Sequence, residues 1–262
     1  MKLSLSGIFR KKKSGNSTLR TQLKKKYGKK GFPRKVYEEE GLSRAAIMTV
    51  ADNTMTSYER MVTLWQQVRY LDRANIPGAL VECGTWRGGA CGMMALSHMS
   101  HGKPPHRELH LFDSFEGLPE PDKDKDGGKA IELAEGRAEG SLSAIGCCVG
   151  SLEENRRLMH EVIKYPESLT SYHVGWFQDT VPGFSRQAGP IALLRLDGDW
   201  YDSTKICLEA FYDLVVPGGI IVIDDYGYWS GCRRAVDEFV AKLDRLPFLN
   251  HIDISARYII KD

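Results

Sequence analysis

Three carboxylates stand at the ends of two apolar runs that the sequence predicts as strands. Asp197 follows the run 191–196, and Asp224 and Asp225 follow the run 218–223. If these strands are neighbours in a parallel sheet, their carboxyl ends meet at the edge where open α/β sheets bind ligands. Carboxylates this close repel one another and favour a bound cation, and oxygen ligands favour magnesium, manganese or calcium over zinc. The competing interpretation is that these acids cap the helices that follow.

A glycine-rich turn, ECGTWRGG at residues 82–89, follows the first predicted strand and leads into a helix. Glycines let the backbone approach a ligand closely, and the start of a helix offers unpaired N–H groups to a negative group. The spacing matches neither the GxGxxG fingerprint nor a Walker loop. Its place after the first strand favours a ligand-binding turn, with a purely structural turn as the alternative.

Asp113 closes the second predicted strand. An acid at this position can accept hydrogen bonds from both hydroxyls of a ribose, as an acid downstream of the glycine turn does in nucleotide-binding sheets. We therefore predict Asp113 as a ribose ligand. A turn-forming aspartate is the alternative.

The segment 116–150 is glycine-rich, polar and long for a connection inside a compact domain. Loops of this length are commonly functional lids or disordered. Asp122, Asp124 and Asp126 match the first half of an EF-hand calcium loop, but position twelve is Leu133. We therefore predict a mobile cover over the substrate rather than a calcium site.

The chain has 262 residues, of which 42% are hydrophobic, and this suits one α/β domain with added segments. No apolar run approaches the ~20 residues that cross a bilayer, and no secretory signal opens the sequence. We therefore expect a cytoplasmic protein. The six cysteines form no CxxC pair, which favours free thiols over disulfides or a zinc site.

The net charge of +2 hides an asymmetry. Residues 1–37 hold thirteen Lys or Arg and no acid, so residues 38–262 carry 23 basic and 34 acidic residues, a balance of −11. Together with four apolar residues before Arg10, this composition suits peripheral contact with an anionic membrane, here the inner face. A disordered solubilising tail is the alternative. No nucleic-acid partner is expected, because no binding motif or interleaved aromatic pattern occurs, and lysines outnumber arginines too strongly for a transit peptide.

From about residue 41 onward, strand and helix patterns alternate. Strands are expected at 79–83, 108–112, 170–177, 191–196, 218–223 and within 251–260, and helices at about 56–76, 90–99, 153–163, 203–214 and 230–243. The alternation predicts an α/β doubly wound parallel sheet. The domain then spans 41–262, with 116–150 as a lid insertion, after a basic and flexible arm at 1–40.

Five stretches together resemble the macrocin O-methyltransferase family of S-adenosylmethionine-dependent enzymes, which modify sugars of antibiotics and related glycosides. They are IPGALVECGTWRGG, LFDSFEGLPEPD, VGWFQDTVP, LRLDGDWYDST and PGGIIVIDDY. The resemblance covers residues 50–262 and implies a seven-stranded class I methyltransferase sheet of Rossmann-like type, with an N-terminal helical extension. The first 40 residues do not map onto the family. The resemblance is compatible with a homodimer, for which the sequence itself holds no feature.

The resemblance also implies the site residues. The cofactor S-adenosylmethionine is expected against Thr54, Met55, Thr56, Glu82, Gly84, Arg87, Gly88, Gly89, Asp113, Ser114 and Trp176. A divalent cation, Mg²⁺ or Mn²⁺, is expected at Asp197, Asp224 and Asp225. The segment 54–56 looks like the stretch that related cation-dependent methyltransferases place against the methionine end of the cofactor.

Such chemistry needs a metal because an aliphatic hydroxyl holds its proton about as tightly as water, with a pKa of ~15.7, and a coordinated cation lowers such a value. We assign proton removal to Asp197, which borders the metal. A histidine is the rival, with His173 and His251 as the nearest candidates, although a lone histidine is more often structural.

Aromatic residues follow both acid-tipped strands and are predicted to contact the substrate, either a sugar's apolar face or an aromatic ring. They are Trp200, Tyr201, Tyr226 and Tyr228, with Trp229 beside them. Packing in the core is the alternative for each. Asp199 and Asp202 are near enough in sequence to assist, although Asp202 more simply caps the next helix.

The sequence thus predicts a cation-dependent O-methyltransferase acting on a hydroxyl of a sugar, a glycosylated small molecule or a glycan. One alternative keeps the fold and moves the methyl group to a catechol-like or CoA-linked phenol. A non-enzymatic alternative is a membrane-tethered scaffold that binds S-adenosylmethionine.

Overall fold

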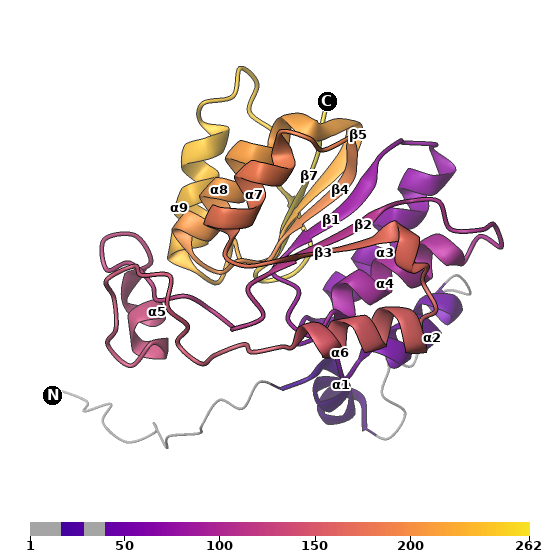
Figure 1. The fold of residues 1–262 in the computed structure, drawn as a ribbon, viewed down its shortest axis with the longest axis horizontal. Coiled ribbons are helices and arrows are strands. Elements are labelled where there is room, and N and C mark those ends of the chain that lie inside the picture. The colour runs from indigo at the N-terminus through magenta and orange to yellow at the C-terminus, as the bar shows by residue number, and fades with distance from the viewer. Residues whose placement is uncertain (1–16, 29–39) are drawn as a thin grey trace, which may run out of the picture.

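The computed structural model describes residues 17–28 and 40–262, and a seven-stranded sheet forms their centre (Figure 1). The strands are β1 (Ala79–Cys83), β2 (Leu109–Asp113), β3 (Thr170–Val174), β4 (Ile191–Leu196), β5 (Val215–Ile223), β6 (Asn250–His251) and β7 (Arg257–Ile260). They lie in the order β3-β2-β1-β4-β5-β7-β6, with β7 antiparallel to β5 and β6 and the other neighbours parallel. The predicted doubly wound sheet is confirmed, and its switch point lies between β1 and β4.

Helices cover both faces of this sheet (Figure 1). One layer contains α2 (Glu40–Val50), α3 (Tyr58–Arg73), α4 (Gly89–Met99) and α6 (Leu152–Arg156), which continues as a π-helical turn over Arg157–Val162. The other layer contains α7 (Phe177–Ser185), α8 (Tyr201–Phe211) and α9 (Ser230–Val240). Short 3₁₀ turns at Glu167–Leu169 and Tyr212–Leu214 precede β3 and β5.

Alternation along each strand divides the core between these layers. On β4, Leu193 belongs to the apolar cluster under α2–α4, whereas Leu194 and Leu196 belong to the cluster under α7–α9. Because side chains alternate with a period of two, Arg195 must share the face of Leu193. The strand therefore carries a charged side chain into one core layer, close to the end where Asp197 follows.

The N-terminal helix α1 (Leu19–Tyr27) is docked on the domain, which corrects the predicted arm boundary at residue 40. Leu19 and Leu23 are buried, and the Leu19 N–H donates to the Thr54 carbonyl at 2.8 Å. The Arg20 guanidinium pairs with Asp52 at 2.6 Å. The remaining parts of the predicted arm, 1–16 and 29–39, lie outside the described residues.

The segment 116–150, which we call the flap, is folded back on itself and contains α5 (Gly127–Leu133). It is anchored to the domain by Trp200, whose Nε1–H donates to the Pro119 carbonyl at 2.9 Å. The Asp126 carboxylate accepts the N–H groups of Tyr201 at 2.7 Å and Asp122 at 2.9 Å. Asp126 is thus committed to backbone groups, which agrees with setting the calcium loop aside.

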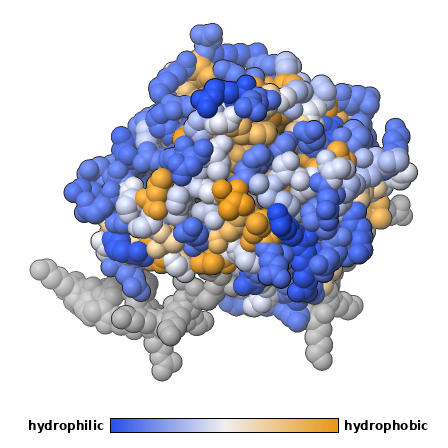
Figure 2. Space-filling view, in the orientation of Figure 1, coloured by the Kyte–Doolittle hydropathy of each residue, from blue (hydrophilic) through white to orange (hydrophobic). Residues whose placement is uncertain are grey.

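The face of the molecule in Figure 2 is mostly hydrophilic, with smaller apolar areas between the polar side chains. Among the described helices, none is both long and apolar enough to span a bilayer. No disulfide links the six cysteines, all of which lie in the described part of the chain, as the sequence predicted.

Candidate functional site

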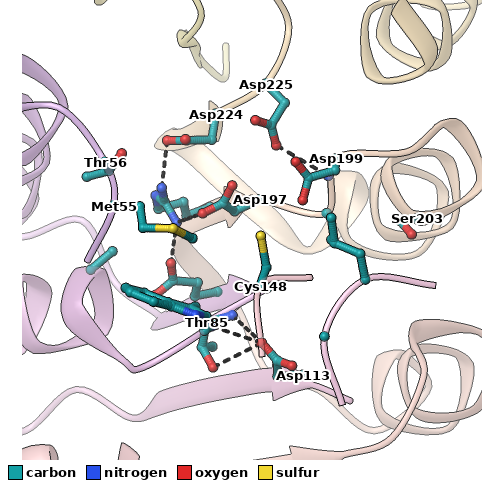
Figure 3. Close-up of a pocket in the computed structure, with 18 of the residues that line it drawn as sticks. Met55, Thr56, Thr85, Asp113, Cys148, Asp197, Asp199, Ser203, Asp224 and Asp225 are labelled. Atoms are coloured by element: carbon teal, nitrogen blue, oxygen red, sulfur yellow. Dashed lines mark hydrogen bonds and ion pairs between the residues drawn. The ribbon is translucent and has the colours of Figure 1, made fainter. Parts of the chain in front are cut away.

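A cavity of about 620 Å³ opens at the carboxyl ends of the central strands (Figure 3). Its walls come from the turn before α3, the glycine turn after β1, the flap and the ends of β2, β4 and β5. The predicted site residues that line it are Thr54, Met55, Thr56, Glu82, Gly84, Gly89, Asp113, Ser114, Trp176, Asp197, Asp224, Asp225 and Tyr228. Most of the predicted site therefore forms one connected cavity.

The three predicted carboxylates meet at the ends of β4 and β5. Leu196 pairs with Ile223, so the residues that follow them are neighbours, and the Asp224 N–H donates to the Leu196 carbonyl at 2.9 Å. One oxygen from each of Asp197, Asp224 and Asp225 lies within 4.8 Å of the others. The geometry of strand ends thus brings together acids that lie 27 positions or more apart, from 197 to 224 and 225.

Arg195 stands at the centre of this cluster, and the sequence analysis missed it. Its side chain is only 3% exposed. Nη1 donates to Glu82 and, at 2.8 Å, to Asp197, while Nη2 donates to Asp224 at 2.6 Å. The available signal was a charged residue inside an otherwise apolar strand, since a buried arginine needs carboxylate partners.

Arg60 on α3 holds the opposite side of Asp224. Its Nη1 donates to Asp224, and its Nε donates to Asp253 at 2.7 Å. Burial opposes ionisation of Asp253, but hydrogen bonds from Arg60, the Ala256 N–H and Ser57 lower its pKa to about 2. Arg60 also lines the cavity, so this network joins α3 and the turn before β7 to the carboxylate cluster.

Asp199 and Asp225 differ from Asp197 and Asp224, because no described basic side chain pairs with them. Among the described residues, neither forms an ion pair with Lys, Arg or His. Asp225 accepts the Asp199 N–H at 3.3 Å, and Asp199 accepts the Trp229 Nε1–H at 2.5 Å. Burial, with the neighbouring acids, raises the pKa of Asp199 to about 8 and that of Asp225 well above its ordinary value. A set of buried oxygens that would otherwise hold protons fits a hard divalent cation.

The cofactor end of the cavity holds a buried hydroxyl without a partner, Thr56 Oγ1, which fits a polar ligand group there. Asp113 lies near the glycine turn (Figure 3) and accepts the N–H groups of Thr85 at 2.7 Å, Trp86 at 3.0 Å and Phe115 at 2.7 Å. Burial raises the pKa of Asp113, and these three hydrogen bonds oppose that rise. The Thr85 hydroxyl also donates to Oδ2 at 3.4 Å, whereas Oδ1 accepts the Phe115 N–H and has a second acceptor position for a ligand hydroxyl.

The glycines of the turn were predicted to let the backbone approach a ligand, but in the structure they let it approach other parts of the protein. A Cβ on Gly84, whose φ is +91°, would overlap the Asp197 carbonyl, and one on Gly89 would meet the Asn53 carbonyl at 2.6 Å. The close approach is therefore to the protein's own backbone. The turn brings β1, the end of β4 and the segment before α3 into contact, and this contact shapes the cavity.

Two predicted cofactor residues, Arg87 and Gly88, are not among the described residues that line the cavity. The Arg87 guanidinium lies over the Trp86 ring at 4.8 Å and pairs with Glu154 at 3.3 Å. A Cβ on Gly88 would meet Asn155 Oδ1 at 2.6 Å. Both positions hold the turn against α6, and their contact with the cofactor stays a prediction.

Of the predicted substrate aromatics, Tyr228 lines the cavity, together with Trp229. Trp200 is buried against the flap, and the hydroxyls of Tyr201 and Tyr226 donate to Glu238 at 2.6 Å and Asp237 at 2.7 Å. The contacts of Trp200, Tyr201 and Tyr226 favour the alternative interpretation, that these side chains pack within the protein. Cys148 of the flap and Ser203 of α8, which the sequence analysis did not assign to the site, also line the cavity.

The two rival histidines lie elsewhere, since neither is among the described residues that line the cavity. The His173 ring stacks on Phe112 with a centroid distance of 4.0 Å. Burial lowers the pKa of His173 to about 4. His251 is exposed in β6. Their positions leave the carboxylates as the groups that can accept a proton inside the cavity.

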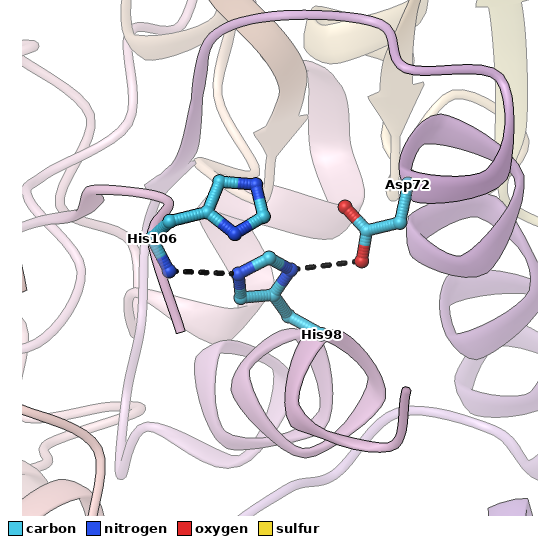
Figure 4. A group of neighbouring side chains, drawn as sticks. All are labelled: Asp72, His98 and His106. Carbon is cyan, nitrogen blue, oxygen red and sulfur yellow. Dashed lines mark hydrogen bonds and ion pairs between the residues drawn. The ribbon is translucent and has the colours of Figure 1, made fainter. Parts of the chain in front are cut away.

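A second cluster with metal-binding residue types consists of Asp72, His98 and His106 (Figure 4). It lies before the amino-terminal end of β2, whereas the cavity lies at the carboxyl ends of the strands. His98 Nε2 accepts the His106 N–H at 3.1 Å, which places the proton on Nδ1, and Nδ1–H donates to Asp72 at 2.8 Å. Asp72 also pairs with Arg107 at 2.6 Å. His98 therefore has no lone pair left for a metal, and the cluster ties α3 and α4 to the start of β2.

Comparisons with known proteins agree with the motifs. Residues 6–261 match the family described as Macrocin-O-methyltransferase (TylF), so the match reaches into the N-terminal segment that the sequence analysis did not map. Demethyldecarbamoylnovobiocin O-methyltransferase of Streptomyces niveus is 34% identical over 222 residues, which are 85% of this chain and 80% of that protein. Mycinamicin III 3''-O-methyltransferase of Micromonospora griseorubida is 32% identical over 194 residues, 73% and 71% of the two chains.

Solved structures agree as well. The O-methyltransferase NovP superposes with a TM-score of 0.68 at 33% identity, covering 80% of this chain and 82% of that one. The calicheamicin methyltransferase CalS11 superposes with a TM-score of 0.57 at 21% identity, covering 88% and 95%, which supports the fold alone.

Substitution Gly84→Ala is expected to lower the free energy of unfolding by about 2–5 kcal/mol, because it combines a left-handed backbone with overlap on the Asp197 carbonyl. Urea unfolding followed by circular dichroism measures this. Gly183→Ala is the matched control, since a Cβ there meets nothing within 4 Å and the position lies in α7. Equal stability of the two variants would contradict the proposed contact.

Asp253 is expected to make stability depend on acid pH. Because its folded pKa of about 2 lies below its ordinary value of 3.8, the unfolded chain binds more protons, so its contribution is present above about pH 4 and is lost between pH 4 and 2. Urea unfolding from pH 2.5 to 5 should therefore be flatter for Asp253→Asn than for the parent chain. Parallel profiles for the two proteins would refute this role, and the exposed Asp244→Asn serves as the control.

Proposed function

The chain belongs to the macrocin O-methyltransferase family, and from this premise we propose that it transfers a methyl group from S-adenosylmethionine to a hydroxyl of a sugar or glycosylated small molecule, assisted by a divalent cation. Its curated relatives are named as O-methyltransferases, so this chain is an enzyme of that class. The scaffold alternative is thereby set aside. A relative from Streptomyces olivaceus, 34% identical over 188 residues, is named for 4'-O-methylation of a compound with a rhamnosyl group, which supports a sugar-bearing acceptor.

One observation carries the proposal: a cluster of carboxylates, in which Asp225 and Asp199 form no ion pair with a described residue, shares a cavity with the glycine turn and the segment 54–56. The donor set of Asp197, Asp224 and Asp225 fits Mg²⁺ or Mn²⁺, because all its ligands are oxygen atoms. When bound, the cation would lower the pKa of the acceptor hydroxyl and orient its oxygen. The unpartnered Thr56 hydroxyl and the Asp113 carboxylate fit the polar groups of S-adenosylmethionine.

The protein's own groups then have defined tasks. Asp197 accepts the proton of the acceptor hydroxyl, because its carboxylate lines the cavity beside the other acids. The oxygen forms a bond to the methyl carbon while the bond from that carbon to sulfur breaks, and the electron pair of that bond stays on sulfur. Thr54, Met55 and Thr56 hold the methionine end of the cofactor, and the fixed positions of donor and acceptor supply most of the rate.

Tyr228 and Trp229 lie at the cavity wall beside the carboxylates. Their rings offer apolar faces for a sugar ring, while Trp229 Nε1–H keeps Asp199 in place. The flap contributes Leu118, Leu133 and Cys148 to the same cavity, and we assign to it the role of a cover that excludes water from the reacting groups. Membrane contact through residues 1–37 and a homodimer remain predictions.

Methyl transfer to a panel of acceptors, measured with radiolabelled S-adenosylmethionine, tests this function. We expect turnover with glycosides that carry adjacent hydroxyls and restoration by Mg²⁺ or Mn²⁺ after chelation. We also expect a loss of at least about 100-fold in Asp225→Asn, since the negative charge of a cation ligand is removed. The exposed acid variant Asp244→Asn should keep full activity. Turnover of vicinal phenols but of no sugar diol would instead favour the phenol alternative, and full turnover with a strong chelator would exclude the cation.

A further inference from the structure

Arg195 joins Glu82, Asp197 and Asp224 through one guanidinium group, and the reaction proposed above gives it no task. We propose that Arg195 is a positioning residue that fixes Asp197 and Asp224 as cation ligands before the cation binds. This inference rests on the proposed function. It concerns how the ligands are held, whereas the family resemblance concerns only which residues they are.

The sheet places the guanidinium between its partners. Arg195 pairs with Glu82 across β1 and with Val222 across β5, and Asp224 lies two residues beyond Val222 on the same face. Asp197 lies two residues beyond Arg195, again on that face. The side chain therefore contacts one carboxylate from each of three adjacent strands or strand ends.

Glu82 anchors this arrangement from behind. It is buried, it accepts the Cys91 thiol at 2.6 Å on one oxygen, and it pairs with Arg195 through the other. With Glu82 fixed in the core, the guanidinium plane is fixed too, and the nitrogens that contact Asp197 and Asp224 point toward the cavity end. A planar fork can make these three contacts at once, whereas a lysine ammonium is a single point charge on a flexible stem.

Asp224 is held on both sides as a result. Arg195 donates to its Oδ1 at 2.6 Å, and Arg60, itself held by Asp253 at 2.7 Å, donates to its Oδ2. Asp197 has one oxygen, Oδ2, held by Arg195 at 2.8 Å. Both side chains therefore keep a fixed orientation, and each carboxylate retains acceptor positions for a cation. Ligands fixed in advance lose little side-chain entropy on binding.

If Arg195 had a purely structural role, the effect of substituting it on cation binding would be different. If Arg195 only neutralised buried acids, a lysine at this position would preserve the charge and hence cation binding. If Arg195 positions the ligands through its fork, the lysine keeps the charge but loses the simultaneous contacts. The substitution Arg195→Lys therefore separates positioning from charge balance.

The experiment titrates the full-length protein with Mn²⁺ and measures free Mn²⁺ by electron paramagnetic resonance. We expect Arg195→Lys to bind Mn²⁺ about 10–100-fold more weakly than the parent chain, the usual cost of losing a residue that orients a metal ligand. Arg107→Lys is the matched control, because Arg107 is another buried, ion-paired arginine at the opposite edge of the sheet. It should lose stability but keep its Mn²⁺ affinity. Circular dichroism and urea unfolding verify that each variant is folded.

If Arg195→Lys does not fold, Glu82→Gln replaces it, since this change weakens the anchor and keeps the Arg195 charge. It should also weaken Mn²⁺ binding. Mn²⁺ affinity equal to that of the parent chain in a folded Arg195→Lys or Glu82→Gln variant would overturn the positioning role and leave the proposed function intact. Absence of saturable, Asp225-dependent Mn²⁺ binding in the parent chain would overturn both this role and the cation in the proposed function.

Discussion

The site depends on an imbalance of buried charge. Arg195 pairs with Glu82, Asp197 and Asp224, and Arg60 pairs with Asp224 and Asp253. Among the described residues, neither guanidinium forms an ion pair with Asp225. A fold that gathers acids at adjacent strand ends must then hold protons or a cation there. Repulsion among these acids lowers the free energy of unfolding, and for the same reason a bound cation would stabilise the folded protein. The acids are not incidental to the fold, because the pairing of β4 with β5 fixes their separation.

The fold and the convergence of Asp197 with Asp224 could be predicted because each acid directly follows an apolar run, and parallel strands end at one edge. The ion-pair partners of Arg195 could not be predicted, because the register between neighbouring strands places Glu82 and Asp224 beside it. The positions of the apolar runs in the sequence do not give that register. The helix α7 was also missed. It is short and includes Pro182 next to Gly183, so local propensity argues against a helix that the layer over the sheet nevertheless stabilises.

Residue type alone misplaced the aromatics for a related reason. Tyr201 and Tyr226 follow acid-tipped strands as Tyr228 does, but their hydroxyls reach Glu238 and Asp237 on α9. The partners are 37 and 11 positions away, so only the packing of α8 and α9 decides which ring faces the cavity. The glycine turn shows the same limit: its sequence indicated close approach, and the tertiary structure determined that the close neighbour of Gly84 is the backbone of Asp197.

Two segments outside the sheet complete the cavity. Ser17 and Gln22 of the α1 region line it on the side of Met55, whose carbonyl accepts a hydrogen bond from Gln22 at 2.7 Å. Leu118 of the flap lines the cavity as well. Neither segment supplies a cation ligand or a strand. The strand ends therefore determine which reaction can occur, and the peripheral segments determine the shape of what can enter. Substitutions in α1 or the flap can thus change acceptor choice without disturbing the balance of charge on which the strand ends depend.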